Sequence, residues 1–183
     1  MSNLVETITN EEEKLVLRIY HDEFASLHDW LDIDGPQIYY KHRKYRLGQH
    51  EIDPVDFGSE EELIQWLKDE KGAKTVKKLY AYEHGGITVK AGNANPFNCQ
   101  WDSGQVGFVT SHKEDDDENI HALIRMVDMC LQGQVYYLTV SKIQENGEEE
   151  IDSCGGVFDD TYYQGCEDLA EYQMGWIPLP KKG

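Results

Sequence analysis

The sequence lacks long hydrophobic runs, and no stretch approaches the roughly 18 apolar residues that a membrane-spanning helix requires. Its first 14 residues also lack the basic and then apolar order of a secretory signal peptide. Both absences predict a protein that stays in the cytoplasm of the cell that makes it. The 39% of hydrophobic residues is enough to build a core, which excludes wholesale disorder.

Cysteine and the usual metal-ligand patterns are also sparse. The four cysteines form no CxxC pair, and a reducing cytoplasm would keep all four (Cys99, Cys130, Cys154 and Cys166) as thiols. The seven histidines include no His-x-x-x-His pair and no HExxH sequence, so we expect no metal site. The chain has neither GxxxxGK[ST] nor GxGxxG, and we therefore expect no nucleotide-phosphate cradle and no cofactor.

Basic residues are few: 17 Lys and Arg stand against 35 Asp and Glu, which gives a net charge of −18. The imbalance is uneven, because residues 41–78 are nearly neutral and the remainder is strongly acidic. Such a protein repels nucleic-acid phosphates and anionic lipid, so we expect no direct binding to nucleic acid or membranes. It attracts a basic surface, such as the groove of a nucleic-acid-binding protein. The alternative is that the acidity serves solubility alone.

Strand patterns predominate along the chain. Segments rich in β-branched and aromatic residues predict strands, and the last two flank Asn146-Gly147, a strong hairpin signal. The segments are residues 15–20, 37–45, 79–82, 86–89, 104–110, 134–143 and 150–158. A helix over residues 10–30 is the alternative to the first of these strands.

Two main helices are predicted. Ser59–Glu62 matches a capping box and opens a helix that ends near Lys71-Gly72. Asp115–Glu118 provides an anionic start for the second helix, which ends before Gly133. In this second helix the apolar residues recur at helical spacing (Ile120, Leu123, Ile124, Val127 and Leu131).

Near the end of the chain, the sequence predicts a short helix over residues 167–172 and an extended tail over residues 176–183. The length of 183 residues predicts one domain that spans residues 1–183. The fold class that we predict is α+β: an antiparallel-rich mixed sheet with two main helices packed on it.

The densest group of polar and aromatic residues lies in Tyr82–Gly86 and Phe97–Gly107. Its glycines imply tight backbone conformations, and Asp102-Ser103-Gly104 suits a turn. The structural interpretation is a buried aromatic corner in which Trp101 belongs to the core. The alternative is a polar site formed by Glu83, His84, Asp102 and Ser103.

A nucleophilic site is conceivable in the same region, with Cys154 as the nucleophile, His84 as the base and Asp102 as the group that orients it. A cysteine among small residues at a strand end more often packs as a small hydrophobic residue. Ser103 lacks the Gly-x-Ser-x-Gly pattern of a serine hydrolase. We therefore expect binding rather than catalysis, with a small cysteine/histidine hydrolase or transferase as the alternative.

The acidic residues at element ends are the predicted partner-binding residues, because side chains there reach outward and would speed encounter with a cationic partner. One group opens the second helix and the other lies at the hairpin tip (Asp115, Asp116, Asp117 and Glu118; Glu148, Glu149 and Glu150). The basic run Lys41–Arg46 is expected to serve as an internal partner for the acidic helices.

Three sequence blocks recur together in a known pattern. The first is His42–Gly48, HRKYRLG, with one residue more than the pattern HRYxLG. The second joins Tyr82–Ile87, YEHGGI, to Phe97–Phe108, FNCQWDSGQVGF. The third is Asp152–Phe158, DSCGGVF. Together the blocks, which span about residues 42–158, resemble a widespread family of small proteins encoded by phages, plasmids and other mobile elements of bacteria.

The chain departs from that family pattern at three positions. Glu83 stands where the family has Asp, Gly85 where it has Ser, and Gly155 where it has Trp. A site that depends on that serine would be absent here. The resemblance implies a mobile-element origin rather than a mechanism.

Small acidic proteins of mobile elements include inhibitors of host restriction enzymes and CRISPR nucleases, many of which occupy a nucleic-acid-binding groove by charge mimicry. Origin and charge together favour an anti-defence protein of the anti-CRISPR or antirestriction kind. An accessory protein of phage replication or host takeover is a further alternative.

Overall fold

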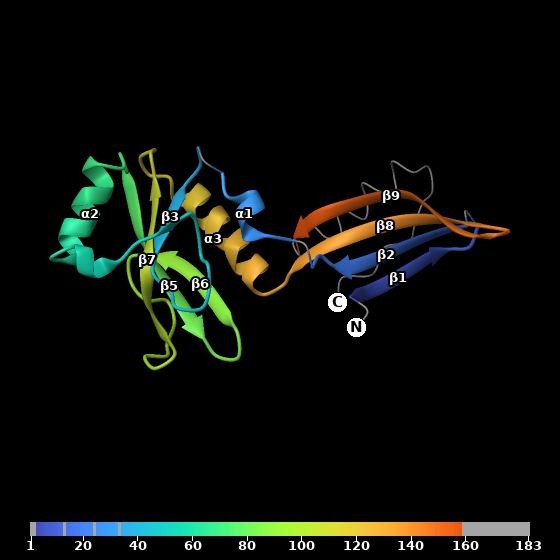
Figure 1. The fold of residues 1–183 in the computed structure, drawn as a ribbon, viewed down its shortest axis with the longest axis horizontal. Coiled ribbons are helices and arrows are strands. Elements are labelled where there is room, and N and C mark those ends of the chain that lie inside the picture. The colour runs from blue at the N-terminus through green and yellow to red at the C-terminus, as the bar shows by residue number, and fades with distance from the viewer. Residues whose placement is uncertain (1–2, 13, 24, 33, 159–183) are drawn as a thin grey trace. The chain divides into compact units, whose positions relative to one another are not determined.

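The computed structural model describes residues 3–158 except 13, 24 and 33 (Figure 1). The predicted short helix at 167–172, the predicted tail at 176–183 and Cys166 lie outside the described residues. The chain forms two compact units: unit 1 comprises residues 1–25 and 133–183, and unit 2 comprises residues 26–132. The predicted α+β class, rich in antiparallel pairing and with two main helices, is confirmed. The strands are divided between two sheets rather than gathered in one.

Unit 1 contains a four-stranded antiparallel sheet in the order β1-β2-β8-β9. Its strands are β1 (Leu4–Asn10), β2 (Leu15–His21), β8 (Val135–Gln144) and β9 (Gly147–Phe158). Alternate residues of a strand point to the same face, so Leu15, Leu17 and Ile19 share one side of β2, where they pack with Leu138 and Val140 of β8. The strand prediction for residues 15–20 is confirmed, and the alternative helix over residues 10–30 is wrong.

The β8–β9 hairpin is confirmed, although its two-residue loop is Glu145-Asn146 because Gln144 pairs with Gly147. Near the other end of β9 the register shifts between Tyr136 and Leu138 of β8, and Gly156 has a φ of +67°. Such a left-handed conformation is natural for glycine in a bulge. The Gly156 N–H donates to Asp22 Oδ2 at 3.2 Å, so the third sequence block forms a bulge that is fixed to the end of β2.

Unit 2 contains a five-stranded mixed sheet in the order β4-β3-β7-β5-β6, in which only the β3–β4 pair is parallel. Its strands are β3 (Gln37–Tyr40), β4 (His50–Glu51), β5 (Thr75–Glu83), β6 (Ile87–Gly92) and β7 (Ser103–Ser111). The helical elements are α1 (Leu27–Trp30), the 3-10 turn η1 (Pro54–Asp56), α2 (Glu60–Asp69) and α3 (Asp117–Leu131). The strand predicted over residues 37–45 ends five residues early, at Tyr40.

The two main helices cover opposite faces of the unit 2 sheet (Figure 1). Neighbouring residues of β7 show this division, because Phe108 packs with Leu67 of α2 whereas Val109 packs in the cluster that contains Ile120 and Ile124 of α3. The α2 capping box is confirmed, since the Ser59 hydroxyl accepts from the Glu62 N–H at 3.2 Å. Strand β7 is therefore covered on both faces around Phe108 and Val109, whereas Ser103–Val106, at the other end of the strand, are exposed or partly buried.

The absence of a side chain at Gly107 allows β3 and β7 to approach each other closely. A Cβ at this position would lie 2.1 Å from the Tyr39 carbonyl oxygen, so no side chain fits between the strands. The glycine of the sequence motif Gly104–Phe108 is therefore a packing requirement of the central sheet.

Candidate functional site

The two halves of the second sequence block meet at one end of the unit 2 sheet. Tyr82 of β5 pairs with Ser103 of β7, and the Glu83 N–H donates to the Asp102 carbonyl oxygen at 2.8 Å. Glu83 therefore lies opposite Asp102 on the neighbouring segment. Like charges placed opposite each other on adjacent strands repel, so this pair requires compensation.

Each of the two carboxylates has its own histidine. His42 Nε2 lies 2.9 Å from Glu83 Oε1, and His84 Nδ1 lies 3.5 Å from Asp102 Oδ2. His42 comes from the first sequence block, so the structure brings the first and second blocks together. The two histidines differ in environment, because the side chain of His42 is 8% exposed whereas that of His84 is 74% exposed.

The ring of His42 is held in one tautomer. Its Nδ1 atom accepts hydrogen bonds from the backbone N–H groups of Lys44, at 3.2 Å, and Tyr45, at 3.0 Å. Backbone N–H groups can only donate, so Nδ1 carries no proton and Nε2–H donates to the Glu83 carboxylate. The ring thus orients Glu83 and shapes the turn of the basic segment at the same time.

Trp101 is 95% exposed, so its prediction as a core residue is wrong. The reason is the loop before β7, whose polar groups bond to one another. Asn95 Nδ2 donates to Ser103 Oγ at 3.0 Å, and the Ser103 hydroxyl donates to the Cys99 carbonyl oxygen. The loop is stabilised by these bonds without using the indole. Ser103 therefore has a structural role in the loop.

Other aromatic rings form a row beside this loop. The ring of His84 stacks on Tyr82 with centroids 6.2 Å apart, and Tyr82 stacks on Phe97 at 5.7 Å. Lys90 Nζ lies 5.5 Å from the centroid of the Phe97 ring. The second sequence block therefore presents rings and charges at the surface of unit 2.

An open pocket of about 690 Å³ lies at this end of the sheet. One side is formed by the basic residues Lys41–Lys44, and the other by Trp101–Gly104 together with Glu83. Lys41 Nζ is 3.5 Å from carboxylate oxygens of both Glu51 and Asp53, so its charge is already balanced. The predicted pairing of the basic run with the acidic helices is therefore wrong for Lys41.

The predicted catalytic residues do not all belong to one unit. His84 and Asp102 are in unit 2, whereas Cys154 is exposed on β9 of unit 1. The cysteine that contacts Asp102 is Cys99, with 3.6 Å between Sγ and Oδ2. Sequence reasoning missed Cys99, although it lies only three residues before Asp102. Its partner is an anion, whereas an activated cysteine needs a base or a cation beside it.

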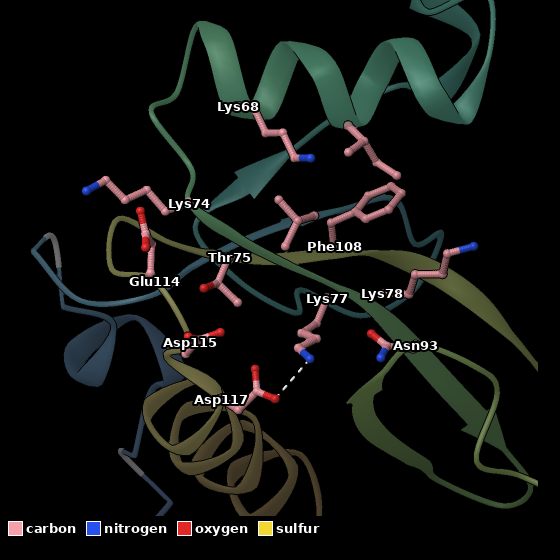
Figure 2. Close-up of a pocket in the computed structure, with 12 residues that line it drawn as sticks. Lys68, Lys74, Thr75, Lys77, Lys78, Asn93, Phe108, Glu114, Asp115 and Asp117 are labelled. Carbon is pink, nitrogen blue, oxygen red and sulfur yellow. Dashed lines mark ion pairs between the residues drawn. The ribbon is translucent and has the colours of Figure 1, made fainter.

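The acidic start of α3 borders a groove of about 580 Å³, which is also lined by residues of α2 and β5 (Figure 2). Asp117 Oδ2 forms an ion pair with Lys77 Nζ at 2.9 Å. Asp116 accepts from the Ser111 hydroxyl and from Asn119 Nδ2, and the Ser111 bond is the main reason why its pKa lies below the ordinary value. Asp115 is exposed and has a φ of +51°.

Within this first predicted partner-binding group, Asp116 and Asp117 thus have partners inside unit 2. Asp115 and Glu118 present their carboxylates at the surface.

The second predicted partner-binding group lies at the β8–β9 hairpin tip of unit 1. Glu148 accepts a two-fold hydrogen bond from the Arg18 guanidinium, at 2.5 and 2.8 Å, and this bond lowers the pKa of Glu148. Glu149 accepts from Gln144 Nε2, and Glu150 is exposed. All residues from 145 to 151 are exposed, so this loop and the start of β9 form a continuous acidic tip.

The described residues include no group of three or more His, Cys, Asp or Glu side chains that could hold a metal ion. Among the helices that the structure describes, none is long and apolar enough to cross a membrane. Comparisons of the chain with protein-family models, with curated proteins and with solved structures gave no match.

Proposed function

We propose that this protein is an anti-defence protein of a phage, plasmid or other bacterial mobile element. In this proposal it binds a host enzyme that handles nucleic acid, such as a restriction enzyme or a CRISPR nuclease, and blocks the basic groove of that enzyme. It acts in the cytoplasm of the host cell, by binding rather than by catalysis. The support comes from charge, from exposure and from the three sequence blocks.

The observation that carries the proposal is the acidic tip of the β8–β9 hairpin. Segments 1–25 and 133–158 together contain 11 Asp and Glu but only three Lys and Arg. Four of these acids lie at the tip, where every residue from 145 to 151 is exposed. At physiological salt the Debye length is about 8 Å. Carboxylates at an exposed tip can come within that distance of a partner, whereas charges farther from the partner are screened.

The carboxylates of the tip can contact a partner on more than one side. Successive side chains of a strand point to opposite faces, so those of Glu148 and Glu150 point away from that of Glu149. Among the strands that the structure describes, β9 lies at the edge of its sheet. A basic groove that encloses the tip would therefore meet carboxylates on both of its faces.

The test is to remove charge at the tip while keeping side-chain size. The variant Glu145→Gln, Glu149→Gln and Glu150→Gln leaves Glu148 in place, because Glu148 is bonded to Arg18 within unit 1. The control variant removes three exposed acids of unit 2 (Asp56→Asn, Glu61→Gln and Glu70→Gln). Both variants have a net charge of −15, so they differ only in where the charge is lost.

Affinity capture from the bacterial host supplies the partner, and its dissociation constant is then measured at several salt concentrations with purified proteins. We expect the tip variant to bind severalfold more weakly and with a shallower salt dependence, while the control variant binds like the wild type. Both should melt close to the wild-type temperature, because the replaced side chains are exposed. Equal affinities and salt slopes for all three proteins would show that the acidity is only solubilising.

A further inference from the structure

The pocket beside Trp101 combines three kinds of group that a purely structural role does not explain. It offers an uncovered indole, two exposed cations and two opposed carboxylates. These groups come from three segments, around residues 42, 83 and 102, which are about 40 and 20 residues apart in the sequence. The β5–β7 pairing and the His42–Glu83 bond bring the segments together. The proposed partner binding at the acidic tip uses none of these residues.

Trp101 is available for stacking. With 95% of its surface exposed it contributes almost nothing to the core, and an indole left in water at the rim of a pocket has a whole face free. Aromatic side chains in such positions stack on flat rings, nucleobases above all, and the stacking tolerates any base because each has a π face. The indole therefore selects a ligand with a planar ring.

Arg43 and Lys44 select an anionic group. Both line the pocket and are exposed, and Lys44 Nζ lies 5.0 Å from the centroid of the Tyr45 ring, a contact that leaves its charge unneutralised. The neighbouring Lys41 is already balanced by Glu51 and Asp53. A guanidinium and an ammonium on consecutive residues are the groups that bind phosphate oxygens. The bonds from His42 to the N–H groups of Lys44 and Tyr45 fix the turn that carries these two cations.

Glu83 and Asp102 select hydrogen-bond donors. They lie opposite each other, and each is contacted by a histidine at one oxygen. The remaining oxygens can accept from a ligand, and donors placed there would relieve the repulsion between the two carboxylates. Among the nucleobases, guanine presents two adjacent N–H donors on its Watson–Crick edge. They match the remaining oxygen of one carboxylate and the second lone pair of the oxygen that its histidine contacts.

We propose that this pocket binds a free guanine nucleotide, with the base stacked on Trp101, its N–H edge on Asp102 or Glu83, and its phosphate on Arg43 and Lys44. A volume of about 690 Å³ is within the range of small-molecule sites, and one nucleotide fits it. A nucleic-acid polymer is disfavoured because a net charge of −18 repels a polyanion more strongly than it repels a single nucleotide. This site is independent of the proposed anti-defence function.

The test is calorimetric titration of the full chain with GMP, with AMP, with guanosine, which lacks the phosphate, and with a short single-stranded oligonucleotide. We expect GMP to bind, AMP to bind more weakly because its base lacks the paired donors, and guanosine to bind more weakly because it lacks the phosphate. Trp101→Ala should weaken GMP binding at least about fivefold, which is the lower end of the effect of losing one stacked base.

Three variants complete the assignment. Asp102→Asn should reduce the ratio of GMP to AMP affinity, and Arg43→Gln with Lys44→Gln should weaken GMP but leave guanosine unchanged. Lys68→Gln with Lys74→Gln is the matched control, because it removes two exposed cations from the separate groove in Figure 2 and should bind GMP like the wild type.

Three results would overturn the proposal: no GMP binding at millimolar concentration, wild-type affinity in Trp101→Ala, or tighter binding of the oligonucleotide than of GMP. An arginine-rich peptide that binds in a Trp101-dependent manner while GMP does not would assign the pocket to a protein partner instead. The acidic-tip experiment measures affinity for the captured partner and not for GMP. Nucleotide binding at the Trp101 pocket and partner binding at the tip can therefore fail independently.

Discussion

Replacing Trp101 by alanine should leave the stability of the protein nearly unchanged. A tryptophan offers about 250 Å² of surface, of which 5% is about 12 Å² when 95% is exposed. At about 25 cal/mol per Å² the loss is about 0.3 kcal/mol. Trp66 is the matched comparison, because it is half-buried and packs edge-on against Tyr39, with ring centroids 6.1 Å apart, and against Phe57 at 5.3 Å. Trp66→Ala should cost about 3 kcal/mol, as tryptophan truncations in cores do.

Urea denaturation followed by far-UV circular dichroism measures both free energies of unfolding, and it does not depend on the fluorescence of the residue that is replaced. The two variants should have the same denaturant slope, so that a shift of the midpoint reports stability alone. A loss of more than about 1 kcal/mol in Trp101→Ala, well above the 0.3 kcal/mol expected from its exposed area, would show that the indole is packed and would refute the reasoning. A loss below about 1 kcal/mol in Trp66→Ala would refute the assignment of that residue to the α2 core.

Three further predictions follow from packing, charge and burial. Gly107→Ala should destabilise unit 2 by about 2 kcal/mol or more, because its Cβ would lie 2.1 Å from the Tyr39 carbonyl oxygen. Gly104→Ala should be tolerated, because no atom lies within 4 Å of the added Cβ. Urea unfolding compares the free energies of unfolding of the two variants. The Arg18 bond lowers the folded pKa of Glu148, so it stabilises the fold above about pH 4.5, and this stabilisation is lost as the pH falls through the folded pKa. Glu148→Gln should therefore be less stable than the wild type at neutral pH and approach it in acid, and a constant deficit at all pH values would contradict this. Burial raises the pKa of Cys130 to about 11, so a thiol reagent at neutral pH should modify the exposed Cys154 well before Cys130, as peptide mass spectrometry can show.

Local patterns predicted those elements whose causes are local. The α3 helix has its acidic start, its apolar stripe and Gly133, at a φ of +71°, within 20 residues of one another. The Ser59 capping box needs only Glu62. The hairpin needs only the turn before Gly147. In each case the interaction that fixes the structure lies within a few residues of the signal.

The misses have non-local causes. Strand β1 is an edge strand whose side chains are largely exposed, so Leu4–Asn10 carries little hydrophobic alternation to detect. The division into two sheets depends on the pairing of Leu17 with Val140, which are more than 120 residues apart. The hydrophobic pattern of a strand does not predict which other strand it pairs with.

The candidate site was half predicted for the same reason. Glu83, His84 and Asp102 were recognised as a polar group, since they are close in sequence or share a motif. The partner of Glu83, His42, lies 41 residues earlier, in a segment that the sequence marked as a basic run and as the first block but did not link to Glu83. The exposure of Trp101 depends on how the loop before β7 leaves the sheet, and an indole among turn residues looks the same in the sequence whether it is buried or exposed.

The order of the strands has a consequence for how the chain folds. Unit 2 is one continuous segment, whereas unit 1 is built from the two sides of it. Strand β2 can pair with β8 only after the whole of unit 2 has been synthesised, so the N-terminal hairpin waits with one edge of β2 unpaired. If unit 2 folds first, it shortens the loop that β2 and β8 must close and so lowers the entropic barrier to joining them. We therefore expect mutations that slow the folding of unit 2, such as Gly107→Ala, to delay unit 1 as well and to increase aggregation during synthesis.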